Sequence, residues 1–212
     1  DGVFLHAPKP LKTISSAVYN AGIGWYKTFV NRIVKPEYEY NHVEQEVEQF
    51  LARKQIEKTE SVVMLTAIDP TTAIVKTYTQ GELSIIIVVT AGVGNAIDAS
   101  KSNLRNEKPY AGTINTWVII NGNLTNEAFV QAMITATEAK SKALQEEQIF
   151  DTVSETIATG TGTDSLLIAA TQTGSLYQYA GPLTPLGQLI GYSVCDATRK
   201  AIQHYKEKNE KN

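Results

Sequence analysis

Apolar residues in this chain follow two different spacings, which predict strands mixed with helices. Residues 83–90 form a continuous run rich in isoleucine and valine, which is typical of a strand covered on both faces. Shorter apolar runs predict further strands over residues 13–19, 61–68, 73–79, 113–121 and 165–171. Gln80, Gly81 and Glu82 separate two of these runs and predict a hairpin link.

Helical spacing of apolar residues appears in four other segments. It predicts an amphipathic helix over residues 41–54, a long helix over 126–145 and a last helix that begins at Pro185. Thr125 and Thr184 are the expected caps of the two long helices, because a hydroxyl there can accept from a free backbone amide. The same spacing predicts a short helix over residues 25–34.

The predicted elements define the fold class. We expect an α/β or α+β fold: a single domain with a mixed, largely buried β-sheet covered by helices. A chain of 212 residues suits one such domain. Residues 1–12 carry two prolines and no period, so they are expected to form a lead-in arm; the domain would span 13–205, followed by a charged tail over 206–212 that frays.

Composition narrows the classes of partner. The net charge is −3 and no segment is strongly basic, which argues against nucleic acid as a partner. The longest apolar run, residues 83–91, is too short to cross a bilayer as a helix, so we expect no membrane insertion. One cysteine, Cys195, fits a reducing compartment, and the chain is expected to be cytoplasmic. Cys195 is expected to be a small buried residue rather than a nucleophile.

Candidate chemistry lies in four stretches rich in Gly, Thr and Asn at the predicted strand ends. Glycines let a ligand approach the backbone, and consecutive amides can bind an anion, although each stretch taken alone can also be a simple turn. The candidate substrate-binding residues in these stretches are Ser16, Asn20, Thr90, Gly92, Gly94, Asn95, Asn121, Asn123, Thr159, Gly160, Thr161 and Gly162.

Other chemistries have little support in the sequence. His6, His42 and His204 have no ligand partner at helical or turn spacing, so no metal site is predicted. The chain has no Gly-x-Ser-x-Gly elbow and no Walker pattern, and Gly92-Val93-Gly94 lacks the third glycine of a dinucleotide-binding loop. A nucleotide site in the loop over residues 159–164 remains an alternative.

Seven segments, taken together and in order, resemble the motifs of the adenosylcobinamide amidohydrolase family. They are residues 15–20, 90–96, 112–116, 121–125, 135–140, 158–164 and 186–191. The resemblance implies hydrolysis of the amide that joins aminopropanol to the corrin ring, giving adenosylcobyric acid in corrinoid salvage. It implies no cofactor, because the cobalt arrives with the corrinoid substrate. It also implies that the chain is fused to, or works with, the ATPase of a corrinoid transporter.

Asp164, Glu138 and Thr163 are the candidate catalytic residues. A carboxylate beside a pocket can activate water or protonate a leaving amine, and Thr163 is a candidate hydroxyl nucleophile. Each acid also has a structural interpretation, since Asp164 can cap a turn and Glu138 can pair with Lys142 one helical turn later. The alternative function is a corrinoid-binding or sensing module without catalysis.

Overall fold

The computed structural model describes residues 1–35, 38, 41–104 and 112–210. Seven strands form one sheet, in the order β3-β2-β1-β12-β7-β5-β4. Their bounds are Gly2–Ser15 (β1), Gly22–Ile33 (β2), Ser61–Thr66 (β3), Ile74–Gln80 (β4), Leu83–Ala91 (β5), Ile114–Asn121 (β7) and Ser165–Ala170 (β12). The helices are Val43–Arg53 (α1), Asn126–Glu146 (α2) and Pro185–Asn209 (α3).

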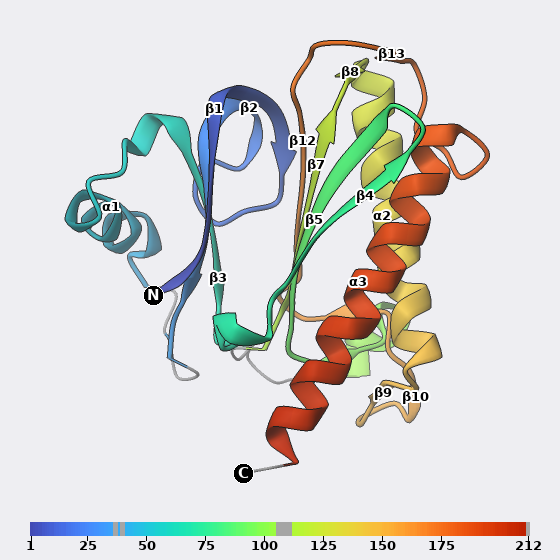
Figure 1. Ribbon diagram of the computed structural model, residues 1–212. Helices are drawn as coiled ribbons and strands as arrows, with labels where there is room; N and C mark the ends of the chain where they lie inside the picture. The colour runs from blue at the N-terminus through green and yellow to red at the C-terminus, as the bar shows by residue number, and fades with distance from the viewer. Residues whose placement is uncertain (36–37, 39–40, 105–111, 211–212) are drawn as a thin grey trace.

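Helices cover the two halves of this sheet separately. Figure 1 shows α2 and α3 side by side against the half that contains β7, β5 and β4, while α1 lies at the far side of β1, β2 and β3. Parallel and antiparallel pairs occur together: β12 runs parallel to β7, and β5 runs antiparallel to it. The structure is therefore a mixed α/β domain with a large mixed sheet, as predicted.

The sheet curls so that its two halves share an inner core. Phe29 of β2 lies 6.4 Å from Trp117 of β7 between ring centroids, and the Trp117 Nε1 atom lies 3.3 Å from the sulfur of Met64 in β3. Strands β3 and β7 are separated by three others in the sheet order, so only strong curvature brings these side chains together. Most strands are thereby buried on both faces.

Several sequence predictions are confirmed with small shifts of boundary. The strands predicted over 61–68, 73–79, 83–90, 113–121 and 165–171 are β3, β4, β5, β7 and β12. Gly81, with a φ of 61°, turns β4 into β5. Thr125 and Thr184 cap α2 and α3, accepting from the amides of Ala128 and Gly187. The helix predicted over 41–54 is α1.

The helix predicted over residues 25–34 is wrong, because this segment belongs to β2. Phe29 faces the inner core while Val30 faces α1, so apolar residues are buried on both faces of the strand. Two-sided burial hides the alternation that usually marks a strand, and the remaining spacing resembles a helix. Pairing with β1 on one side and β3 on the other fixes the extended conformation.

The two chain ends also differ from expectation. The expected lead-in arm, residues 1–12, lies almost wholly within β1, whose register shifts between His6 and Leu11, around the two prolines. The expected fraying tail continues α3 to Asn209. Lys206 donates to the backbone oxygen of Glu147, and Lys208 pairs with Asp69. Residues 211–212 of that tail lie outside the described part.

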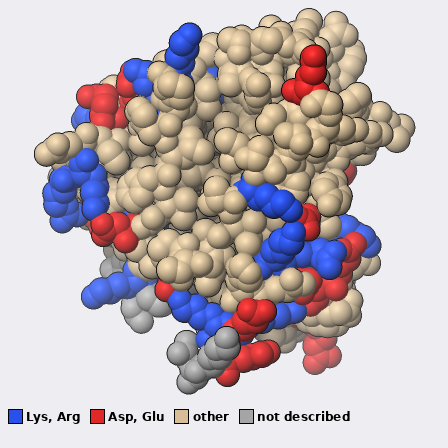
Figure 2. All heavy atoms as spheres, viewed as in Figure 1, with Lys and Arg blue, Asp and Glu red and all other residues tan. Residues whose placement is uncertain are grey.

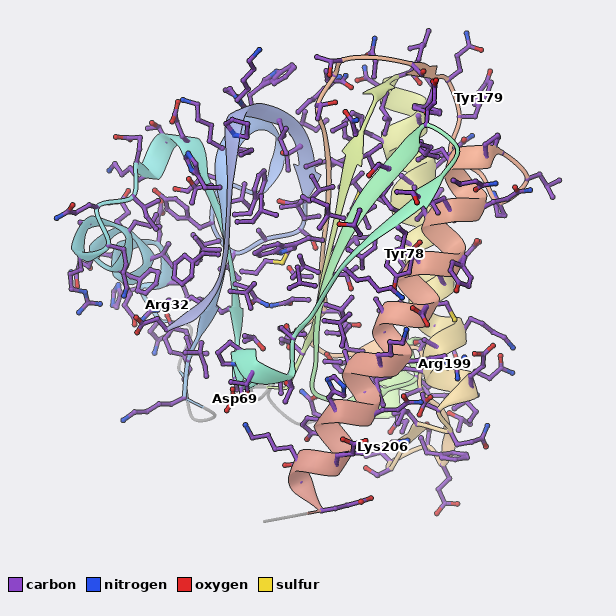
Figure 3. The ribbon with its side chains drawn as sticks, viewed as in Figure 1. Arg32, Asp69, Tyr78, Tyr179, Arg199 and Lys206 are labelled. Carbon is purple, nitrogen blue, oxygen red and sulfur yellow. The ribbon has the colours of Figure 1, made fainter. Side chains whose placement is uncertain are left out.

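Charged side chains hold the second half of α3 in place. Figure 2 shows them gathered on the lower part of the molecule, where this half of the helix lies in Figure 1. Asp69 and Lys206, both labelled in Figure 3, belong to this group. The Lys208 ammonium, together with the hydroxyl and amide of Thr71, holds the pKa of the Asp69 carboxyl well below its usual range.

Candidate functional site

Strand direction decides which of the predicted loops can meet. Strands β7 and β12 run parallel and begin at the same edge of the sheet, while β5 and β1 run antiparallel to them and end there. This edge therefore carries Ser16, Thr90 and the loop that ends at Asp164. Asn121 ends β7 at its other end, with Asn123 just beyond it, about 20 Å away at 3.3 Å per residue. The four predicted stretches thus do not form one site.

Asp164 lies at the centre of the polar contacts on the first edge. Its Oδ2 accepts from Lys140 Nζ of α2 at 2.5 Å. Its Oδ1 accepts from the Thr161 hydroxyl at 2.5 Å and from the backbone amide of Ile114 at 3.0 Å. The Lys140 and Asp164 side chains are only 15% and 17% exposed. Hydrogen bonds to a charged group are stronger than neutral ones, so these three bonds hold the partly buried carboxylate in one position.

Gly160 lies so close to this ion pair that a side chain at this position would displace it. A Cβ atom at residue 160 would lie 2.3 Å from Asp164 Oδ2 and 2.7 Å from Lys140 Nζ. At Gly162, two residues later, the nearest atom to a Cβ would be Ile97 Cδ1 at 3.2 Å. The close approach expected of this glycine loop therefore occurs at Gly160, where the backbone lies against the ion pair.

Two clefts meet at the Lys140–Asp164 pair. The first lies between α2 and the beginnings of β7 and β12, and its lining includes Thr116, Ala136 and Ser165. The second lies between α2 and the loop over residues 159–162, and extends to Asp98. Lys140, Asp164 and Thr137 line both clefts. The ion pair is therefore accessible from two sides although little of its surface is exposed.

The first cleft also contains a buried hydroxyl with spare bonding capacity. Thr116 is 2% exposed, and its Oγ1 has no hydrogen-bond partner among the described residues. Ser16 lines the same cleft; its hydroxyl oxygen accepts from the amide of Leu166 at 3.0 Å and lies 3.4 Å from the Ser165 hydroxyl. A polar ligand in this cleft would find hydroxyl groups on two sides.

The other predicted binding residues have structural partners at or near this edge. Thr90 is buried and accepts from Asn31 Nδ2 at 2.8 Å, while Asn20 donates to two backbone oxygens. Gly92 packs against Ile68, a Cβ there lying 2.1 Å from Ile68 Cδ1. Gly94 and Asn95 also lie outside the linings of the two clefts, whereas Thr159, Gly160, Thr161 and Gly162 line the second.

The two remaining catalytic candidates, Glu138 and Thr163, line neither cleft. Glu138 is exposed and lines neither cleft, and Lys142 pairs instead with Glu146 at 4.0 Å. Thr163 donates to the backbone oxygen of Gly112 at 3.1 Å. Of the three catalytic candidates, Asp164 is therefore the one that lines the clefts.

Lys140 is the residue that sequence reasoning missed. The signal was helical spacing: Lys140 lies four residues after Ala136, on the side of α2 that faces the sheet, whereas Glu138 lies two residues after Ala136 and points away. Thr116 carried no comparable signal in the sequence, because only the packed structure shows that its buried hydroxyl has no hydrogen-bond partner among the described residues. Both residues fall inside segments already noted for family resemblance.

Cys195 contributes no activated thiol. It is half-buried on α3, and burial, followed by the nearby Glu146 carboxylate, raises the pKa of its thiol. Among residues 1–35, 38, 41–104 and 112–210, no three His, Cys, Asp or Glu side chains group as metal ligands would. None of the helices in this part of the chain combines the length and the apolar character needed to span a membrane.

The fold and the clefts define a class of protein: a single mixed α/β domain with a carboxylate–ammonium pair that lines two clefts beside α2. The chain belongs to the adenosylcobinamide amidohydrolase family, which it matches over residues 1–210. The motif resemblance noted in the sequence is thereby confirmed.

Individual relatives add the following similarities. The uncharacterized protein MJ1613 of Methanocaldococcus jannaschii is 43% identical over 96 residues, 45% of this chain and 37% of that protein. The uncharacterized ABC transporter ATP-binding protein YvrA of Bacillus subtilis is 24% identical over 203 residues, 96% of this chain and 37% of that protein. The matches thus span little more than a third of either relative. The PH0078 protein of Pyrococcus horikoshii OT3 is similar in structure, with a TM-score of 0.43, 8% identity and coverage of 92% of this chain and 73% of that one.

Proposed function

We propose that this protein hydrolyses the aminopropanol amide of adenosylcobinamide, giving adenosylcobyric acid and free aminopropanol. Family membership over residues 1–210 supports the substrate and the reaction. The observation that supports the location of the active site is that the Asp164–Lys140 pair lines both clefts. Amide hydrolysis needs a base for water, a stabiliser of the oxyanion and an acid for the amine, and this pair offers groups for each task.

Asp164 is the proposed general base. A carboxylate has about four lone-pair sites, and Thr161, Ile114 and Lys140 occupy three of them. One site on Oδ2 is left for a water molecule. As the water oxygen bonds to the amide carbon, its proton passes to Asp164. When the C–N bond breaks, Asp164 returns that proton to the departing nitrogen, so the carboxylate is regenerated.

Lys140 is the proposed stabiliser of the tetrahedral intermediate. Its ammonium carries three donors, one of which bonds to Asp164, so two remain for the oxygen that becomes negative. The attraction between this cation and the oxyanion is strengthened because the side chain is only 15% exposed. Thr161 positions the carboxylate by donating to Oδ1.

The test compares Asp164→Asn with Glu138→Gln, a matched acid-to-amide change on the exposed side of α2. Mass spectrometry after incubation with adenosylcobinamide measures the cobyric acid and aminopropanol formed. Asp164→Asn should lower kcat by about 10²–10⁴-fold with folding intact, and Glu138→Gln should leave it nearly unchanged. A loss below about threefold for Asp164→Asn would rule out the assigned base. Tight binding of adenosylcobinamide to the wild type without turnover would instead identify the non-catalytic corrinoid-binding module.

A further inference from the structure

A separate hollow, lined mainly by apolar side chains, lies beside the two clefts of the candidate site. Ile14 of β1, Ile23 of β2, and Phe129 and Val130 of α2 line it. The register pairs Ile14 with Ile23 and Lys12 with Trp25, so these side chains lie on one face of the sheet. Ile14 packs against the same core as α2, which shows that this is the face covered by the helix.

The apolar side chains around this hollow are left uncovered. Ile23 is 71% exposed, Trp25 is 55% exposed, and Val130 and Ile134 are each 52% exposed. Single exposed apolar residues are ordinary, but here Ile23 and Val130 line one hollow. Trp25 is the next residue on the same face of β2 and pairs with Lys12 of the lining, and Ile134 lies one turn after Val130 on α2. We call Ile14, Ile23, Trp25, Phe129, Val130 and Ile134 the apolar shelf.

Lys12, which also lines the hollow, already has partners. Lys12 donates to Asn126 Oδ1 at 2.8 Å, and its ammonium lies 5.3 Å from the centre of the Phe129 ring. The charge therefore faces α2 and its aromatic ring rather than a second ionic partner. The shelf as a whole suits a flat, largely apolar body better than an anionic one.

The linings of the hollow and of the first cleft follow one another along α2 and at the end of β1. Along α2, Phe129 and Val130 line the hollow, and Met133 and Ala136, on the following turns, line the cleft. Ile14 of β1 lines the hollow, and Ser16, just after β1, lines the cleft. The ten helical steps from Val130 to Lys140 span about 15 Å at 1.5 Å per residue. One long molecule can therefore occupy both.

We propose that the shelf binds the macrocycle of the corrinoid while the first cleft receives the aminopropanol arm. This inference rests on the proposed function, whose substrate joins a large flat ring carrying methyl groups to one scissile amide arm. The ring buries apolar surface against Ile23, Val130 and the indole of Trp25, which favours binding without acting on the reaction itself. The shelf thus sets affinity, and the Asp164–Lys140 pair sets the rate.

The test uses adenosylcobyric acid, which carries the macrocycle but not the scissile amide, as the probe. Equilibrium dialysis read by visible absorbance measures its Kd for the wild type, Trp25→Ala, Val130→Asp and Val75→Asp. The last variant makes the same substitution at a 61% exposed valine on β4, away from the shelf. Trp25→Ala and Val130→Asp should each raise Kd by about tenfold or more, while Val75→Asp should leave it within about twofold.

Steady-state kinetics on adenosylcobinamide supply the second measurement. The two shelf variants should raise KM and leave kcat within about threefold, which is the signature of lost uniform binding. If both shelf variants show the Kd and KM of the wild type, and the wild type hydrolyses adenosylcobinamide, the shelf does not bind the macrocycle, whereas the proposed function still holds. If the wild type neither binds the probe nor hydrolyses the amide, the proposed function fails, and the shelf assignment fails with it.

Discussion

Gly160→Ala is the substitution that best separates the geometry of the candidate site from the stability of the fold. It adds a single methyl group in the loop beside α2, at a position whose backbone is not in the left-handed region. The backbone therefore tolerates alanine, and any effect must come from the space that the methyl group takes. That space contains Asp164 Oδ2 and Lys140 Nζ.

The magnitude follows from the distances. The new Cβ would lie 2.3 Å from Asp164 Oδ2, whereas ordinary contact begins near 3.4 Å, so the carboxylate oxygen must move by about 1 Å. A misplacement of about 1 Å in a reacting group can lower the rate by about 10²-fold. We therefore expect kcat on adenosylcobinamide to fall by about 10²-fold. The free energy of unfolding should fall by at most about 3 kcal/mol, because one charge-assisted hydrogen bond is disturbed and no core is opened.

Gly162→Ala is the matched control in the same loop. A Cβ at that position would meet only Ile97 Cδ1, at 3.2 Å. Rates from product formation and unfolding curves in urea should therefore be close to the wild type. Full activity in Gly160→Ala, with the fold intact, would show that the position of the Asp164–Lys140 pair does not limit the reaction. Equal losses in both variants would point to a general disturbance of the loop.

Two further predictions concern buried polar groups and pH. Thr90→Val should lower the free energy of unfolding in urea by about 1–3 kcal/mol, because it leaves the buried Asn31 amide without its 2.8 Å acceptor. Thr116→Val removes a hydroxyl that has no partner among the described residues, so it should leave that free energy nearly unchanged. Equal losses of stability in the two variants would contradict this reasoning. Burial alone raises the pKa of Asp196, but hydrogen bonds from Lys200 and from Tyr78, labelled in Figure 3, outweigh it and lower that pKa to about 2. The stabilisation from this carboxylate is present above the unfolded pKa of about 3.8 and is lost as pH falls through about 2. Asp196→Asn should therefore flatten the dependence of the free energy of unfolding on pH between these two values. An unchanged pH dependence in the variant would refute this.

Local patterns in the sequence determined those structural features that depend only on residues close together in the chain. The caps at Thr125 and Thr184, the turn at Gly81 and the buried run of β5 all follow from residue type and spacing within a few positions. The glycine and threonine loop that ends at Asp164 was visible in the same way. These features depend on the chain a few residues on either side, so the sequence alone defines them.

Only the tertiary structure determined that residues 22–33 form strand β2, which residues meet in the candidate site, and where the apolar shelf lies. Strand β2 looked helical because core and α1 bury it on opposite faces, and that two-sided burial exists only once the sheet has curled. Asn121 was separated from Asp164 by strand direction, which no local pattern encodes. Lys140 comes 24 residues before Asp164, and they meet only because α2 packs on β12. Contacts between residues distant along the chain depend on packing the whole sheet, because the free energy that fixes them comes from burying surfaces shared by several elements.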